Sequence, residues 1–103
     1  MWKGHNKATV VEKYAEEFFS IIQIIAVDKK LLQAFFQDIL TPAEYREIGT
    51  RWQIVKQLAR GESQRKIAKD LGISIATITR GSRELLDKEG GFQRVLQKLS
   101  KKK

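Results

Sequence analysis

Apolar residues recur at helical spacing along nearly the whole chain. Between about Thr9 and Val27 they form one stripe, which extra phenylalanine and isoleucine residues widen beyond what a surface helix needs. A second apolar pattern spans about Lys29 to Ile39, after a break at Asp28. A helix that is apolar around so much of its circumference must pack against a large apolar surface. In a chain of 103 residues, a second subunit is the natural candidate.

Four further helices are predicted from their capping and ending residues. Pro42 suits the first position of a helix, and Gly61 suits the residue that follows its end. Ser63 and Ser74 are each placed to cap the helix that follows them. The four expected helices span about residues 42–60, 64–70, 75–87 and 92–99. Because no long strand alternation occurs, the chain is predicted to be all-α with six helices.

The length of the chain is that of a single domain. Its expected parts are a flexible N-terminus, the core and dimerisation helices, a helix-turn-helix, a C-terminal helix and a basic tail. In that order, these parts are residues 1–8, 9–60, 63–87, 92–99 and 100–103.

The stretch from Ser63 to Leu86 has the pattern of a helix-turn-helix. Two helices that cross steeply need a small residue where they approach, and Ala68 supplies it. Their short turn needs a left-handed backbone, which Gly72 adopts without steric cost. Four aliphatic residues fall where the helix pair must pack inward: Ile67, Leu71, Ile73 and Ile78.

The outer face of the second helix carries small residues first and basic ones later, which suits entry into a DNA major groove. The residues predicted to contact DNA on this helix are Ser74, Ile75, Ala76, Thr77, Thr79 and Arg83. Those predicted to bind the phosphate backbone from the preceding helix are Gln64, Arg65, Lys66 and Lys69. The competing interpretation is a plain helical hairpin with a solvated basic face. A generic helix pair rarely combines an alanine, a glycine and four inward aliphatic residues at these offsets with a basic outer face.

The charge balance favours an anionic partner. The net charge is +8, although part of the excess lies in the C-terminal lysine run, which is most simply a solvated tail. With no cysteine and one histidine, His5, the chain offers no catalytic triad and no zinc site, so an enzyme is not expected. The apolar run 18–27 is too short to cross a bilayer, which needs about twenty residues. A remaining alternative is an interaction module whose basic helices dock on a protein or a membrane.

The octet Ile75–Ser82 resembles the Trp repressor family, and three shorter matches support it: Leu40–Pro42, Gly49–Arg51 and Ser63–Arg65. The resemblance implies an all-α, six-helix intertwined homodimer with a helix-turn-helix reading head. It also implies a cytoplasmic, nucleoid-associated bacterial repressor that binds a two-fold operator in double-stranded DNA. L-tryptophan would be its co-repressor, and no other cofactor is implied.

The same resemblance implies a tryptophan pocket. Arg51 and Arg80 would flank the indole ring, and Arg80 would bind the carboxylate. Thr41 would hydrogen-bond that carboxylate, Gly81 would leave room beside the ring, and the Leu40 carbonyl would accept from the ammonium. Each residue also has a plainer explanation: the threonine as a helix cap, the arginines as surface or phosphate-binding residues.

Four features depart from the family pattern. Glu84 stands where the family often has a serine near the ligand's ammonium, and it could instead pair with Arg80 one helical turn away. Such a pair would leave a regulator that needs no ligand or senses another small molecule. Arg83 adds a charge on the DNA side, and the loop 61–63 is one residue shorter. The fourth departure, Asp38, leads to a hypothesis: it forms an acidic pole with Glu84, opposite the two arginines, that suits a zwitterionic amino acid.

Overall fold

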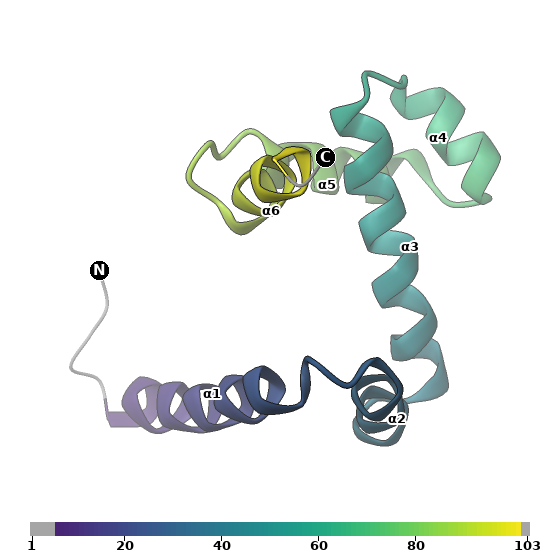
Figure 1. The fold of residues 1–103 in the computed structure, drawn as a ribbon. Coiled ribbons are helices and arrows are strands. Elements are labelled where there is room, and N and C mark those ends of the chain that lie inside the picture. The colour runs from purple at the N-terminus through teal and green to yellow at the C-terminus, as the bar shows by residue number, and fades with distance from the viewer. Residues whose placement is uncertain (1–5, 102–103) are drawn as a thin grey trace. The chain divides into compact units, whose positions relative to one another are not determined.

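The computed structural model describes residues 6–101, with side chains from Thr9 onward. In this range the chain folds into six helices and contains no strand, which confirms the predicted all-α class (Figure 1). The helices are α1 (Asn6–Ile25), α2 (Lys29–Ile39), α3 (Pro42–Ala59), α4 (Gln64–Leu71), α5 (Ile75–Leu85) and α6 (Gly91–Ser100). The predictions for His5, for residues 1–5 and for the last two lysines of the tail lie outside the described residues.

The helix ends lie close to their predicted positions, with two informative differences. Helix α1 begins at Asn6, three residues before the expected start at Thr9. Helix α5 ends at Leu85, two residues early, because Asp87 begins a turn. The backbone N–H of Gly90 donates to the Asp87 carbonyl at 2.9 Å, and that of Glu89 donates to the Asp87 carboxylate at 3.0 Å.

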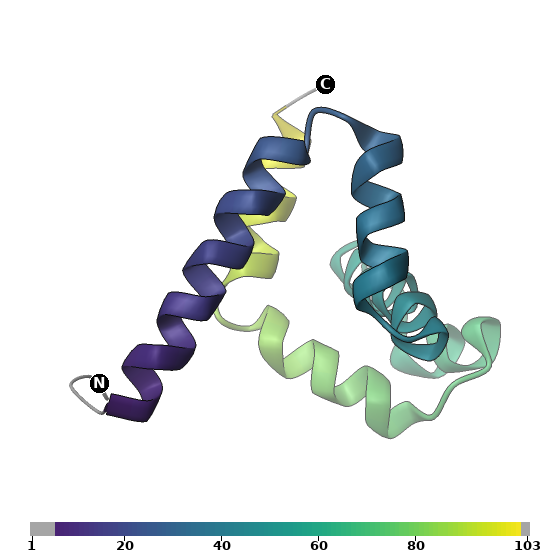
Figure 2. The same ribbon diagram turned by 90° about the horizontal axis from the view of Figure 1, so that it is seen from below.

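Contacts divide the chain into two compact units, residues 1–42 and 43–103. In the first unit, α1 and α2 form the two arms of a V (Figure 2). The arms pack through phenylalanine rings: the centroid of Phe18 lies 5.9 Å from that of Phe35 and 6.2 Å from that of Phe36. The side chain of Asp28, where the sequence indicated only a break, caps α2 by accepting the Leu31 N–H at 3.1 Å.

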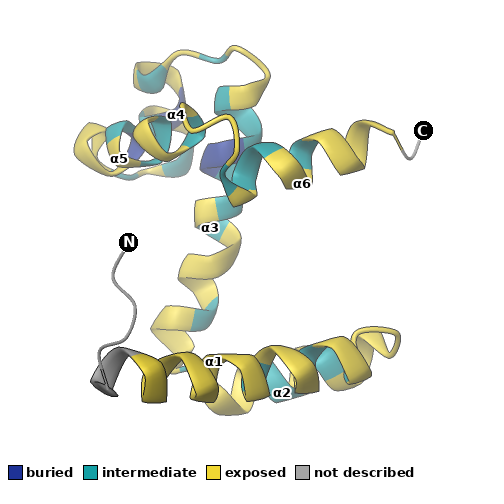
Figure 3. Cartoon of the chain, turned by 90° about the vertical axis from the view of Figure 1, so that its left-hand side faces the viewer, coloured by how far each residue is buried: buried dark blue, intermediate teal, exposed yellow. Residues whose placement is uncertain are grey.

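The described side chains of α1 and α2 include none that is buried (Figure 3). Ile24 is 74% exposed, Tyr14 is 68% exposed and Phe19 is 65% exposed. Much of the wide apolar stripe seen in the sequence therefore stays exposed, although Phe18, Ile22 and Ile25 are half-buried. The division into one domain of 103 residues stays a prediction.

The second unit has a small aliphatic core beneath the helix-turn-helix. Ile54 from α3, Ile67 from α4 and Ile78 from α5 form its buried centre (Figure 3). Four half-buried residues pack against it: Leu58, Ala68, Leu71 and Ile73. All four aliphatic residues predicted to point inward thus take part in this core, which fixes α4 and α5 on α3.

The turn between α4 and α5 depends on Gly72. Its φ of 68° and ψ of 35° place it in the left-handed region, and its N–H donates to the carbonyl of Ala68. The Ile73 N–H bonds the same carbonyl at 3.1 Å. Ser74 then caps α5 by accepting the Thr77 N–H at 3.3 Å, as Ser63 caps α4. The predicted turn chemistry is confirmed.

We expect Gly72→Ala to lower the free energy of unfolding by about 1 kcal/mol, because an alanine in the left-handed region is strained. Gly49→Ala is the matched control. Gly49 lies inside α3 with ordinary backbone angles, and an added Cβ would meet nothing within 4 Å. Alanine there should raise the stability by up to about 1 kcal/mol. Urea denaturation of both variants checks this, and two shifts of the same sign would contradict it.

Candidate functional site

The N-terminal part of α5 presents small side chains to solvent. Ser74, Ile75, Ala76 and Thr77 are all exposed, and Ile75 retains 48% of its accessible surface. The Thr77 hydroxyl lies 3.0 Å from that of Ser74. Ile78 in the next turn is fully buried in the core, and Ala76, two residues before it, lies on the opposite side of the helix. This exposed side is the face that the sequence predicted to enter a DNA groove.

A side-chain hydrogen bond links α4 and α5 beside this face. The Thr79 hydroxyl donates to the Gln64 side-chain oxygen at 2.8 Å and also lies 3.0 Å from the Ile75 carbonyl. Both Gln64 and Thr79 are half-buried. The two residues were predicted to contact DNA separately. In the structure they bond each other and tie the two helices together.

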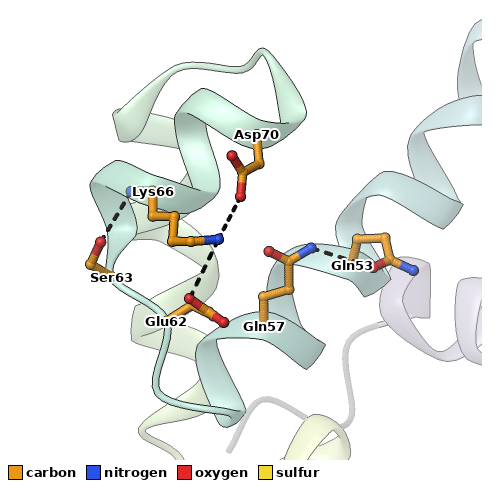
Figure 4. A network of polar contacts seen from close by, with 6 residues as sticks. All are labelled: Gln53, Gln57, Glu62, Ser63, Lys66 and Asp70. Carbon is orange, nitrogen blue, oxygen red and sulfur yellow. Dashed lines mark hydrogen bonds and ion pairs between the residues drawn. The ribbon is translucent and has the colours of Figure 1, made fainter.

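The basic residues predicted to contact DNA fall into two groups. Lys66 forms two ion pairs: its ammonium lies 2.8 Å from the Asp70 carboxylate and 3.8 Å from that of Glu62 (Figure 4). The pKa of Lys66 is raised from its ordinary 10.5, chiefly by the hydrogen bond to Asp70. Three exposed residues form no ion pair within the described part of the chain: Arg65, Lys69 and Arg83.

A pocket of about 480 Å³ lies within the second unit, between α3, α5 and the start of α6. Its volume falls in the range of small-molecule sites. Four of the six residues implied to bind tryptophan line it: Arg51, Arg80, Gly81 and Glu84. The other two, Leu40 and Thr41, belong to the first compact unit, as does Asp38, and their ligand roles stay predictions.

The charged groups of the pocket are not equivalent. A guanidinium nitrogen of Arg51 lies 3.6 Å from a carboxylate oxygen of Glu47, one turn earlier on α3. Arg80 and Glu84 form no ion pair with each other or with another described residue. The alternative in which Glu84 neutralises Arg80 internally is therefore not found. One cation and one anion of the pocket remain available to a ligand.

The pocket includes residues that the sequence analysis missed. Glu47 and Thr50 line it from α3, and Phe92 lines it from α6. Glu47 had a usable signal, because it lies four residues before Arg51 and so shares its helix face. The sequence carries no comparable sign for Phe92, which enters through the packing of α6 near α5. Thr77, predicted to contact DNA, also borders the pocket and connects it with the exposed face.

Gly81 has a packing role in addition to lining the pocket. A Cβ at this position would lie 3.1 Å from the Ile54 Cγ2 atom and 4.0 Å from the Leu58 Cδ1 atom. Since Ile54 is only 3% exposed, α5 approaches α3 closely at this point. The glycine therefore allows the close approach of the helices that shape the pocket.

Neither a metal centre nor a membrane-spanning helix is found among residues 6–101. No group of three or more His, Cys, Asp or Glu in this range is arranged to hold a metal ion. None of the helices in the same range is long and apolar enough to span a membrane.

Comparison with known proteins gives a consistent result. The model of the family described as Trp repressor protein matches residues 13–100. The chain is 41% identical over 71 residues to the Trp operon repressor homolog of Chlamydia trachomatis serovar L2, covering 68% of this chain and 76% of the relative. It is 38% identical over 76 residues to the Trp operon repressor homolog of Vibrio campbellii, covering 71% of this chain and 76% of the relative.

Proposed function

Because the chain belongs to the Trp repressor family and is a transcriptional regulator of that type, we propose that it binds an operator in double-stranded DNA with L-tryptophan as co-repressor. The observation that carries the proposal is the exposed face of small side chains at the start of α5, held on a buried core. Its place of action is the bacterial cytoplasm, at the nucleoid.

The start of α5 suits the major groove both sterically and chemically. Ala76 and Thr77 are small enough for the helix to approach the base edges, and Ile75 offers an apolar contact for a thymine methyl. Around this face, Arg65, Lys69 and Arg83 are exposed and carry no ion pair, so they are available to phosphates. Phosphate contacts of this kind position the helix, while the contacts to base edges select the sequence.

L-tryptophan suits the pocket beside this face. Arg80 supplies a cation for the carboxylate, and Glu84, one helical turn further along, supplies an anion for the ammonium. Ile54, Val55 and Phe92 give the pocket an apolar part for the ring. A ligand bound there contacts both α3 and α5, so it fixes the orientation of the helix that enters the groove.

A homodimer accounts for the exposed apolar surface of α1 and α2. Phe19 is 65% exposed and Ile24 is 74% exposed, so these helices carry more apolar surface than a surface helix needs. A second copy offers a self-complementary partner for this surface. The resulting two-fold symmetry matches a two-fold operator. Sedimentation equilibrium measures the association directly, and a monomer at micromolar concentration would contradict it.

The test of the function is selection of bound sequences from random DNA duplexes, with and without 1 mM L-tryptophan. We expect one symmetric sequence to be enriched and its affinity to rise by about tenfold or more with tryptophan. Equal affinity without tryptophan would indicate a regulator that acts without a ligand or senses another small molecule. Binding without any sequence preference would indicate an interaction module instead.

Asp70→Asn should strengthen DNA binding. The change removes a carboxylate near the phosphates and releases Lys66 from its shorter ion pair. We expect affinity for non-specific duplex to rise about threefold, with a salt dependence steeper by about one unit. Fluorescence anisotropy over a range of salt concentrations measures both quantities. Asp87→Asn, which removes the same charge from the turn after α5, is the control, and an equal effect of both variants would contradict the release of Lys66.

A further inference from the structure

We infer that Glu47 determines the charge selectivity of the pocket by neutralising Arg51, so that ligands with an ammonium group are preferred over anions of the same ring. The inference deepens the proposed function and rests on the tryptophan pocket described there. Nothing in the family resemblance assigns a role to this residue. The assignment comes from its ion pair with Arg51 and from its place in the pocket wall.

The two arginines of the pocket differ in how their charge is balanced. Arg51 has Glu47 at 3.6 Å, on the same helix face, whereas Arg80 has no ion pair among the described residues. The pocket therefore offers one free guanidinium, not two. A carboxylate-bearing ligand has Arg80 as its available cation, and Arg51 remains free to contact the ring with its flat face.

The charges that line the pocket also balance formally: Arg51 and Arg80 carry two positive charges, and Glu47 and Glu84 carry two negative ones. A zwitterion keeps this balance, because its carboxylate adjoins Arg80 and its ammonium adjoins Glu84. An anion with the same ring has no ammonium group to contact Glu84. With this ligand bound, the pocket carries one net negative charge. The balance thus favours L-tryptophan over its des-amino analogue, indole-3-propionate.

Removing Glu47 changes this preference without unfolding the protein. Its side chain is 61% exposed and that of Arg51 is 70% exposed, and ion pairs so open to water contribute little to stability. In Glu47→Gln the released Arg51 becomes a second site for a carboxylate. The pocket then has one net positive charge and accepts anions more readily.

The experiment is calorimetric titration of the whole chain with L-tryptophan and, separately, with indole-3-propionate. We expect Glu47→Gln to shift the ratio of the two affinities toward indole-3-propionate by about fivefold, the scale of one solvent-screened charge. The melting temperature should stay unchanged. Glu89→Gln, which removes the same charge from the turn before α6 and outside the pocket, should leave the ratio unchanged.

A second comparison tests whether Glu47 acts through Arg51. In an Arg51→Gln background the released cation is missing, so adding Glu47→Gln should change the ratio by less than twofold. A full fivefold shift in that background would overturn the role through Arg51. If the original protein binds L-tryptophan but Glu47→Gln leaves the ratio unchanged, the inference fails alone. If the original protein binds neither compound, the proposed ligand fails, and the inference fails with it.

Discussion

Arg80→Ala should abolish the response to L-tryptophan while leaving the protein folded. Arg80 lines the pocket and forms no ion pair among residues 6–101, so its charge is available to the ligand's carboxylate. A charge-assisted contact of this kind contributes about 1.5–3 kcal/mol, and its loss lowers affinity by about tenfold to a hundredfold. Calorimetric titration measures the ligand affinity, and DNA binding with and without tryptophan measures the response.

Arg83→Ala is the matched control for this prediction. It removes the same charge from the same helix, but Arg83 does not line the pocket. We expect its tryptophan affinity to stay within about twofold of the original, while its DNA affinity falls and the salt dependence flattens by about one unit. A tryptophan response that survives Arg80→Ala, or that both variants lose equally, would show that the carboxylate binds elsewhere.

The second large effect is on stability. Ile67→Ala removes a fully buried side chain, 0% exposed, from the junction of α3, α4 and α5. Deletions of this kind cost about 2–5 kcal/mol, because a cavity is left in addition to the lost burial. For a small protein this is a large part of the total stability. We expect the midpoint of urea denaturation to fall sharply and DNA binding to be lost with the fold.

Ile75→Ala separates stability from recognition. The same chemical change is made 8 residues later along the chain, at a side chain that is 48% exposed on the outer face of α5. Its stability should change by about 0.5 kcal/mol or less. Its preference for the selected operator over random DNA should nevertheless fall. A large loss of stability in this variant would mean that Ile75 packs inward, which contradicts its role at the groove.

Much of the fold could be predicted from the sequence because it is fixed by local rules. Ser63 and Ser74 each cap the helix expected of them, since such caps depend only on neighbouring residues. Gly72 takes the left-handed turn for an equally local reason. Helix ends are harder to predict from sequence. The side chain of Asp87 bonds the backbone of Glu89 and so starts a turn, but the sequence alone does not show whether the turn or a longer helix forms.

The candidate site was less predictable, because it depends on contacts between elements. Arg51, Arg80 and Glu84 were found through family resemblance and spacing, and they do line one pocket. The pairing of Gln64 with Thr79 joins residues 15 positions apart and cannot be inferred from helix periodicity. Lys66 illustrates a different limit. From the sequence, this lysine could bind either a DNA phosphate or one of two nearby carboxylates. In the structure it forms ion pairs with both carboxylates.

The hydrogen bond from Thr79 to Gln64 restricts which nucleotide atoms Gln64 can recognise. Its carbonyl oxygen already accepts a hydrogen bond from the threonine hydroxyl, whereas the two N–H bonds of its amide stay available as donors. Adenine is usually recognised by a glutamine that accepts from N6 and donates to N7 together. That two-point pairing competes with the threonine. Phosphate oxygens, guanine O6 and purine N7, which need only a donor, are therefore the favoured partners of Gln64.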